Sequence, residues 1–430
     1  MINENNLQNE KPKPPAFYRW FVLVVISIAM FGNYYVYDSI APIADILKAD
    51  LGYSDENIGQ LYSFYSFAAI VVLMIGGIII DKYGTKRSTL FFGFVCSVAA
   101  IVTAISPDLY IMLSGRVLLG LGAEPLIVAI TTALAKWFKG KELSFAFGIN
   151  LTIARLGSVA ADNSPTWASG LYTNWQDPLY LSAMIGLSCL VGGVTYFILE
   201  RNAEKRYTLG EAEETEKFVW SDLLKFSKSY WYIVGLCIVF YSAIFPFRSF
   251  AIKFFIEAHG ESREFAGFLN SILPLSAMIA TPIFGLIVDK VGKRSLFMMA
   301  GSLVLLPVYL MMVYTDISLF VPIALMGVAF SLIPAVMWPS VAYIVNANRL
   351  GTAYSLMTLI QQIGLAAFNW MIGAANDYGG ASAQNPAGYE YGMWIFSILG
   401  FLGLFFAFML RRSEMGSDGH GLEYPSGKKE

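Results

Sequence analysis

Apolar segments of about 20 residues recur along the whole chain, and they restrict its possible folds more than any other feature. A helix needs about 20 residues to cross a hydrocarbon core about 30 Å thick. Of the 430 residues, 56% are hydrophobic and only 14% are charged, whereas soluble domains are about 25% charged. In lipid the backbone must satisfy its own hydrogen bonds, which favours helices over open sheets. The sequence therefore predicts an all-α integral membrane protein.

The polar stretch at 200–228 divides these apolar segments into two sets of six. Its mixed charges are typical of a solvated, partly helical linker. The predicted organisation is a tail at 1–17, a six-helix bundle at 18–199, the linker at 200–228, a second six-helix bundle at 229–410 and a tail at 411–430. The twelve expected spans are 18–44, 58–80, 88–106, 109–136, 143–164, 178–199, 229–256, 264–288, 295–314, 318–345, 352–376 and 390–410.

Lys and Arg residues gather on the side of the membrane that both termini share. With the N-terminus in the cytoplasm, the cytoplasmic segments hold 23 of the 29 Lys and Arg residues. The positive-inside rule then predicts that both termini and the linker are cytoplasmic. The other six are Lys48, Lys253 and Arg263 toward the outer side, and Arg116, Arg155 and Arg248 within spans.

A short motif appears once in each half, directly after the second span. "GIIIDKYGTKR" occupies 77–87 and "GLIVDKVGKR" occupies 285–294, with 208 residues between Asp81 and Asp289. A pure topology signal would need only basic residues, so the repeated aspartates and glycines indicate a further role. The repeat predicts two related halves, and transporters built in this way bind their substrate between the halves near the midplane.

The doubled motif, the twelve spans and the two sets of six resemble the major facilitator superfamily of transporters. The resemblance implies a fold of two pseudo-symmetric six-helix bundles and a motif that acts as a cytoplasmic latch. Ion pairs at helix ends are weak enough to be made and broken as the protein changes which side is open. By this resemblance the latch residues are Gly77, Asp81, Lys82, Gly84 and Arg87 in the first half and Gly285, Asp289, Lys290, Gly292 and Arg294 in the second.

Two opposite charges lie at one depth inside the fourth and fifth spans. Glu124 precedes Trp137 by 13 residues, and Arg155 follows Glu142 by 13 residues. At 1.5 Å per residue, each charge lies about 20 Å from the connecting turn, close to the bilayer centre. Two such charges can offset each other's desolvation as a brace between the helices. Ionisable residues inside a membrane more often face a cavity and serve function, so we favour substrate binding over the brace.

The same segments resemble one branch of the superfamily, the lysosomal dipeptide transporters. The matching stretches include "GLGAEPLIVA" at 120–129, "WFKGKELSFAFGINLTIARLGS" at 137–158 and "WPSVAYIV" at 338–345. The resemblance implies that Glu124 binds the ammonium end of a dipeptide and Arg155 its carboxylate, for which the planar guanidinium is suited. Arg248 departs from the pattern of the branch, and Leu119 departs from that of the superfamily, which usually has a glutamine at this place.

The C-terminal half carries no matching pair of charges, since the 208-residue offset leads from Glu124 and Arg155 to Leu332 and Ile363. We therefore expect an asymmetric site, in which the second half supplies a less polar wall. The residues expected in this wall are Tyr241, Trp338 and Gln361, each of which could instead only pack or bond between helices. Tyr34, Tyr35, Tyr37 and Asp38 are interpreted as rim residues toward the outer end of the first span.

Other functions find less support. The two histidines, His259 and His420, lie at the edge of the spans or outside them, and no metal-ligand or nucleophile motif appears, so neither an enzyme nor a cofactor or metal site is expected. A channel would need rings of like charge or a continuous polar lining. The alternative transporter is a proton-coupled carrier of organic anions, with Arg155 on a carboxylate and Glu124 carrying the proton.

The expected partners are the lipid bilayer and a small-molecule substrate, a dipeptide by resemblance, and not nucleic acid. The resemblance also raises an accessory membrane subunit, which the sequence does not reveal. The N-terminal residues "MINENNLQNEKPKPPAFYRW" contain no acidic dileucine signal, and the tails are short. These features favour a bacterial cytoplasmic membrane over the alternative, a lysosomal membrane.

Overall fold

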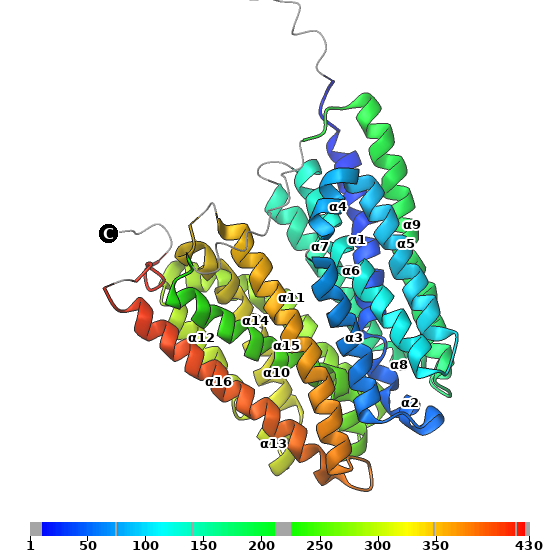
Figure 1. Ribbon diagram of the computed structural model, residues 1–430, viewed down its shortest axis with the longest axis vertical. Helices are drawn as coiled ribbons and strands as arrows, with labels where there is room; N and C mark the ends of the chain where they lie inside the picture. Colours follow the sequence, from blue (N-terminus) through cyan, green and yellow to red (C-terminus); the bar gives the residue numbers. More distant parts are fainter. Residues whose placement is uncertain are drawn as a thin grey trace, which may run out of the picture.

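The computed structural model describes residues 11–73, 75–138, 142–210, 225–346, 349–417 and 419–425. The predicted linker therefore lies partly outside the described residues, as do parts of both predicted tails. Within the described residues, eleven helices are long and apolar enough to cross a membrane, and a bent pair can form a twelfth span. The chain is an all-helical membrane protein arranged as two bundles of helices (Figure 1).

The N-terminal bundle contains the first six spans. Its second span is the bent pair, α3 and α4, which meet at an angle of 53°. The last helix, α9, continues to Arg206 and so extends into the stretch predicted as linker. The helices of this bundle are α1 (Ala16–Asp38), α2 (Ala44–Leu51), α3 (Asp55–Leu73), α4 (Gly76–Tyr83), α5 (Thr85–Ala104), α6 (Leu109–Trp137), α7 (Leu143–Asp162), α8 (Ser164–Trp167) and α9 (Gln176–Arg206), with short 3₁₀ turns η2 (Ala41–Ile43) and η3 (Ser169–Leu171).

The C-terminal bundle contains the other six spans. Its third span is divided into α12 and α13 around Leu306 and Pro307, since proline lacks the N–H that the helix ladder needs. Serines begin two of its helices: the hydroxyls of Ser227 and Ser262 accept hydrogen bonds from the N–H groups of Tyr230 and Phe265. The helices are α10 (Lys228–His259), α11 (Arg263–Val291), α12 (Arg294–Leu305), α13 (Val308–Tyr314), α14 (Phe320–Ile344), α15 (Leu350–Gly379) and α16 (Glu390–Glu414), with a 3₁₀ turn η6 (Pro386–Tyr389).

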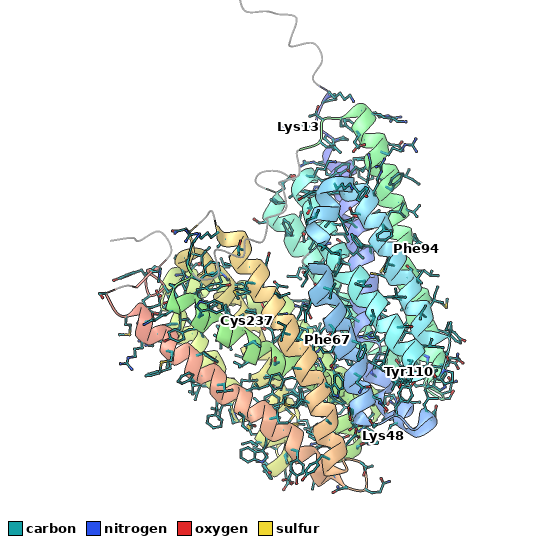
Figure 2. All side chains as sticks on the ribbon, in the orientation of Figure 1. Lys13, Lys48, Phe67, Phe94, Tyr110 and Cys237 are labelled. Carbon is teal, nitrogen blue, oxygen red and sulfur yellow. The ribbon has the colours of Figure 1, made fainter. Side chains whose placement is uncertain are left out.

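Large apolar side chains cover the flanks of both bundles. Phe94 on α5 and Tyr110 on α6 are 51% and 79% exposed, and Figure 2 shows both on the flank of the N-terminal bundle. In water a surface so rich in apolar groups would be unfavourable, whereas in lipid it is the expected exterior.

The internal repeat is visible in the backbone at the two copies of the latch motif. Gly84 ends α4 with a φ of 77°, and Gly292 ends α11 with a φ of 69°. Each glycine N–H donates a hydrogen bond of 2.8 Å to the carbonyl four residues earlier, on Ile80 and Val288. A residue with a side chain is strained at such positive φ, so both copies require glycine at this helix end.

The two most extensive helix contacts between the bundles are those of α3 with α15 and of α7 with α11. The first pair is formed by spans 2 and 11, and the second by spans 8 and 5. The repeat relates span 2 to span 8 and span 11 to span 5, so the two pairs are equivalent. A Cβ on Gly59 of α3 would lie 2.3 Å from the carbonyl oxygen of Asn369, and one on Gly267 of α11 would lie 2.1 Å from that of Asp162. These glycines are 208 residues apart, so the same repeat position allows both close approaches.

The bundles meet at one end and separate toward the other. We call the end that carries both terminal segments the inner end, after the orientation that the basic residues predict. Figure 1 shows the bundles close together near α2 and α8, at the outer end, and apart near α4 and the C-terminal segment. With the inner end defined in this way, the arrangement of the two bundles is inward-facing.

Candidate functional site

Glu124 occupies the middle of α6 and is held from both bundles. Its Oε1 accepts hydrogen bonds of 2.9 Å from the Tyr65 hydroxyl on α3 and from Nε2 of Gln362 on α15. Among the described residues, no group donates a hydrogen bond to Oε2, and this oxygen is not fully buried. The carboxylate therefore has one oxygen fixed by the protein and one that can receive a donor from a ligand.

Arg155 in the middle of α7 lies between two aromatic rings. Its guanidinium carbon is 5.7 Å from the ring centre of Tyr34 on α1 and 5.7 Å from that of Phe330 on α14. Cations are attracted to ring faces at this distance. No carboxylate among the described residues pairs with Arg155, so its donors are available for an anionic ligand.

The two charges do not form an ion pair with each other. No contact within 4.0 Å joins Glu124 and Arg155 in the described part of the chain. Their helices also do not pack mainly on one another, because α6 packs on α3 and α5 while α7 packs on α1 and α11. Helices α6 and α7 do contact each other, but less extensively than they contact these neighbours. A brace between α6 and α7 would require the direct pair that is missing here.

A chain of aromatic rings in the C-terminal bundle leads toward Arg155. Trp338 Nε1 donates a hydrogen bond of 2.9 Å to the Tyr241 hydroxyl, and their ring centres are 6.5 Å apart. Tyr241 stacks on Phe245 at 5.7 Å, and Phe245 meets Phe330 at 5.9 Å. Of the predicted wall residues, Tyr241 and Trp338 thus lie together, and Phe245 connects Tyr241 to the Phe330 ring beside Arg155.

The structure brings Gln362 to Glu124, whereas Gln361, which was expected in the wall, lies elsewhere. The side-chain oxygen Oε1 of Gln361 faces the Cys237 thiol, with 3.9 Å between oxygen and sulfur. Consecutive residues point about 100° apart around a helix, so sequence alone could not say which glutamine faces inward. Tyr34, interpreted as an outer rim residue, lies instead beside Arg155.

Sequence reasoning missed Gln362, Tyr65, Phe245 and Phe330 as members of this region. The signal for Gln362 was present, since polar amides in apolar spans usually have a bonding partner. The three aromatic residues resemble the many others in the spans and carry no distinguishing signal.

Arg248 is buried at the outer end, where it joins the two bundles. It is 3% exposed, and its Nη2 donates to Oδ2 of Asp162 at 2.8 Å, while Nη1 lies 3.4 Å from Oδ1 of Asp38. The other Asp162 oxygen accepts a hydrogen bond of 2.8 Å from Asn270. We call Asp38, Asp162, Arg248 and Asn270 the outer cluster. Arg248 had no assigned role in the sequence, and here it closes the outer end.

A second buried cation supports the same closure. Lys253 was counted toward the outer side, but it is fully buried within α10. Its ammonium lies 2.9 Å from a carboxylate oxygen of Asp55 on α3 and 2.7 Å from the Tyr389 hydroxyl. Asp377 on α15 accepts the backbone N–H groups of Asp55 and Glu56 at 2.8 and 2.7 Å, at the beginning of α3. The outer ends are therefore fastened by several charged contacts.

Several side chains of the two latch motifs have partners within their own bundles. In the first copy, Lys86 pairs with Glu204 on α9, and Thr85 donates to Glu200. In the second copy, Arg294 donates to Asp289 and to the Tyr343 hydroxyl, at 3.0 Å in each case. Lys82, Lys290 and Arg87 are exposed at the inner end, at a distance along the helices from the midplane charges.

The C-terminal segment 419–425 packs onto the second latch motif. The N–H groups of Lys293 and Arg294 donate to the carbonyls of Glu423 and Leu422, both at 3.1 Å. Leu422 is fully buried, and Arg294 Nη1 donates to the carbonyl of Tyr424 at 3.0 Å. The segment thus accepts a hydrogen bond from one of the side-chain nitrogens of Arg294.

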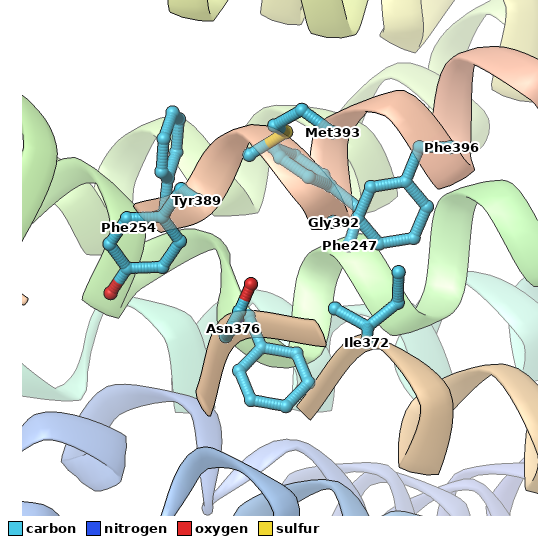
Figure 3. Close-up of a pocket in the computed structure, with 9 residues that line it drawn as sticks. Phe247, Phe254, Ile372, Asn376, Tyr389, Gly392, Met393 and Phe396 are labelled. Atoms are coloured by element: carbon cyan, nitrogen blue, oxygen red, sulfur yellow. The ribbon is translucent and has the colours of Figure 1, made fainter. Parts of the chain in front are cut away.

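A small cavity inside the C-terminal bundle is lined by neither Glu124 nor Arg155. Figure 3 shows that aromatic and aliphatic side chains surround it, together with Asn376. None of the predicted substrate-binding residues lines it. In addition, no group of three or more His, Cys, Asp or Glu side chains among the described residues is placed to hold a metal ion.

Comparison with known proteins identifies the family. The family model described as Major Facilitator Superfamily matches residues 26–253 and 248–423. A Homo sapiens protein named lysosomal dipeptide transporter MFSD1 is 31% identical over 376 residues, which cover 84% of this chain and 80% of that protein. The Danio rerio protein of the same name is also 31% identical, over 84% of this chain and 82% of that protein. A Cupriavidus necator protein named probable sulfoacetate transporter SauU is 19% identical over 64% of this chain and 66% of its own length.

Solved structures share the fold. A bacterial homologue of the human lysosomal transporter Spinster, in an inward-facing and unoccupied conformation, superimposes with a TM-score of 0.74 at 14% identity, over 93% of this chain and 98% of that chain. A point mutant of the nucleoside transporter NupG gives a TM-score of 0.73 at 14% identity, over 91% of this chain and 99% of that chain. The chain therefore belongs to the major facilitator superfamily, a family of membrane transporters and not of enzymes.

Proposed function

We propose that this transporter carries small zwitterions, dipeptides first among them, by alternating access through a site that contains Glu124 and Arg155. One observation carries the proposal: Glu124 and Arg155, which the sequence predicts at one depth, do not pair with each other among the described residues. An unpaired charge away from water is costly, by several kcal/mol in buried cases. A ligand with a free ammonium and a free carboxylate would satisfy both charges at once.

The surroundings of each charge support this division of roles. Glu124 keeps Oε2 without a donor among the described residues, which suits an ammonium. Arg155 presents a planar guanidinium that can hold a carboxylate through two parallel hydrogen bonds. The aromatic wall of Tyr241, Trp338 and Phe330 offers apolar surface to the side chains between the two ends. The dipeptide transporters that share 31% of their residues with this chain agree with this choice of ligand.

The alternative is a carrier of organic anions, with Arg155 on the carboxylate and Glu124 as a proton carrier. The lack of a carboxylate partner for Arg155 in the described part of the chain agrees with it, and so does the relative named as a sulfoacetate transporter. It differs from the zwitterion proposal in requiring no ammonium on the ligand. It also requires uptake that responds to an imposed pH gradient.

Binding of capped ligands to the purified protein tests the proposal. A dipeptide with free ends should bind, and its N-acetyl and C-amide forms should each lose about tenfold in affinity or more, which is ~1.4 kcal/mol. The measurements are thermal shift and isothermal titration calorimetry with the same dipeptide in all three forms. Tight binding of a simple dicarboxylate together with no response to dipeptides would support the organic-anion carrier instead.

The orientation in the membrane, the role of the latch motifs and the protein partners are proposed from the sequence. We propose that both termini face the cytoplasm. We also propose that the latch motifs stabilise one of the two conformations, inward-facing or outward-facing, relative to the other. An accessory membrane subunit is a further proposal, which co-purification from the native membrane would test.

A further inference from the structure

Helix α15 contacts α3 through a line of residues that leads from the outer end to Glu124. At the outer end Asp377 accepts the N–H groups that begin α3. Deeper in the membrane, the Ser63 hydroxyl donates to the carbonyl of Ala366 at 2.6 Å. One further turn inward, Gln362 reaches Glu124. We call this line the α3–α15 seam, and Gln362 lies at its inner end.

Gln362 has an unusual environment for a glutamine inside a span. It is only 4% exposed, and its Nε2 donates to Oε1 of Glu124 at 2.9 Å. Its own Oε1 is buried and has no hydrogen-bond partner among the described residues. A buried polar atom without a partner is unfavourable, so packing alone would favour an apolar residue here. The hydrogen bond to the charged Glu124 carboxylate offsets the cost of burying the amide, because such a bond is stronger than one between neutral groups.

The bond fixes the orientation of the Glu124 carboxylate from the opposite bundle. Tyr65 and Gln362 both donate to Oε1, so the plane of the carboxylate is defined and Oε2 is directed away from these two donors. Without Gln362, only the Tyr65 hydroxyl would hold the group, and the carboxylate could rotate about its terminal torsion. A carboxylate held in one orientation binds a ligand donor with a smaller loss of entropy.

We propose that Gln362 is a positioning residue that makes recognition of the ligand's ammonium depend on contact between the two bundles. This inference rests on the proposed function, because it assumes that Glu124 binds an ammonium. The amide belongs to the C-terminal bundle and the carboxylate to the N-terminal bundle. When α3 and α15 move apart, Glu124 loses this hydrogen-bond donor and binds the ammonium less tightly. Selectivity for a free amine is then greatest in the inward-facing arrangement.

Gln361 supplies a matched control on the same helix. It has the same side chain one residue away, and it faces Cys237 rather than Glu124. Gln361→Met and Gln362→Met remove the same chemical group and keep the length of the side chain. Any general effect of an apolar residue in α15 on folding should appear in both variants.

The experiment compares the dissociation constants of a free dipeptide, its N-acetyl form and its C-amide form. In the unmodified protein, the ratio of N-acetyl to free should be about ten or more, as the proposed function requires. In Gln362→Met this ratio should fall to about threefold or less, while the ratio of C-amide to free, which reports on Arg155, should stay unchanged. Gln361→Met should keep both ratios. If Gln362→Met does not fold, Gln362→Asn withdraws the amide from Glu124 by one methylene and should lower the same ratio.

The outcomes separate this inference from the function on which it rests. If the unmodified protein does not distinguish free from N-acetyl dipeptide, the proposed function itself is wrong. If it does, and Gln362→Met distinguishes them equally well, Gln362 has no positioning role. An equal fall of both ratios in Gln362→Met would show a general distortion of the site and would also overturn the inference.

Discussion

Arg248 of the C-terminal bundle donates a hydrogen bond of 2.8 Å to Asp162 of the N-terminal bundle. Both side chains are buried, and each belongs to a different moving part of the transporter. The bond must break when the outer end opens, because the two helices that carry it then separate. In the inward-facing arrangement it replaces the water that both charged groups would otherwise bind.

Removing one partner of this pair should weaken the inward-facing arrangement. Asp162→Ala leaves Arg248 with Asp38 only, at 3.4 Å. Loss of one partner of a buried ion pair typically costs about 3–5 kcal/mol, so a lower melting temperature and a shift toward outward-open protein are expected. Melting of the purified protein and distances between spin labels at the outer ends measure the two effects.

Asp45→Ala is the matched control for Asp162→Ala. Asp45 also pairs across the bundles, with Arg263, but both side chains are partly exposed, at 17% and 20%. Because it is more accessible to water, this bidentate pair should contribute less than the buried pair of Arg248 and Asp162. An effect of Asp45→Ala as large as that of Asp162→Ala would contradict the role given to burial of the outer cluster.

Glu124→Gln should discriminate between direct ligand binding and a purely structural role. The substitution removes the negative charge and keeps the size of the side chain. The free dipeptide should lose about tenfold in affinity or more, whereas the N-acetyl form should change little because its ammonium contact is already absent. Calorimetric titration of the four combinations gives the coupling energy. Equal losses for both ligands would mean that Glu124 acts only on the structure.

Asp289→Asn should slow transport without weakening ligand binding. Asp289 lies at the inner end of α11 and accepts a hydrogen bond from Arg294, distant along the chain and the helix from the midplane charges. The substitution weakens an ion pair that serves the conformational cycle. Transport into proteoliposomes should fall severalfold, and the dissociation constant measured in detergent should stay within about twofold. Asp316→Asn, at the outer end of the same bundle, is the control and should leave both quantities unchanged. Loss of binding in Asp289→Asn would place this residue in the substrate site.

Cysteine labelling should show that the linker side faces the cytoplasm. Cys96, Cys189 and Cys237 are all buried, so the background reaction should be small. Asn202→Cys, exposed at the inner end of α9, should react with an impermeant thiol reagent only after the cells are opened. Thr173→Cys, exposed at the outer end, should react in intact cells. The reverse pattern would invert the orientation that the positive-inside rule predicts.

The sequence by itself determined the membrane spans and the internal repeat, and it predicts the depth of the two central charges. Span length is set by bilayer thickness, and depth along a helix follows from a fixed rise of about 1.5 Å per residue. The repeat was visible as the 208-residue offset between Asp81 and Asp289, and the structure shows it again in Gly84 and Gly292. These properties depend on distance along one chain segment, which a sequence states directly.

Only the tertiary structure decided which residues face each other around the site. It placed Gln362 rather than Gln361 at Glu124, moved Tyr34 from the rim to Arg155, and gave Arg248 its two aspartates. Each outcome depends on the rotation of a helix about its axis and on which helix lies beside it. Both are fixed by packing between segments that lie far apart in the sequence, by 86 residues for Asp162 and Arg248 and by 238 for Glu124 and Gln362, so no local pattern determines them.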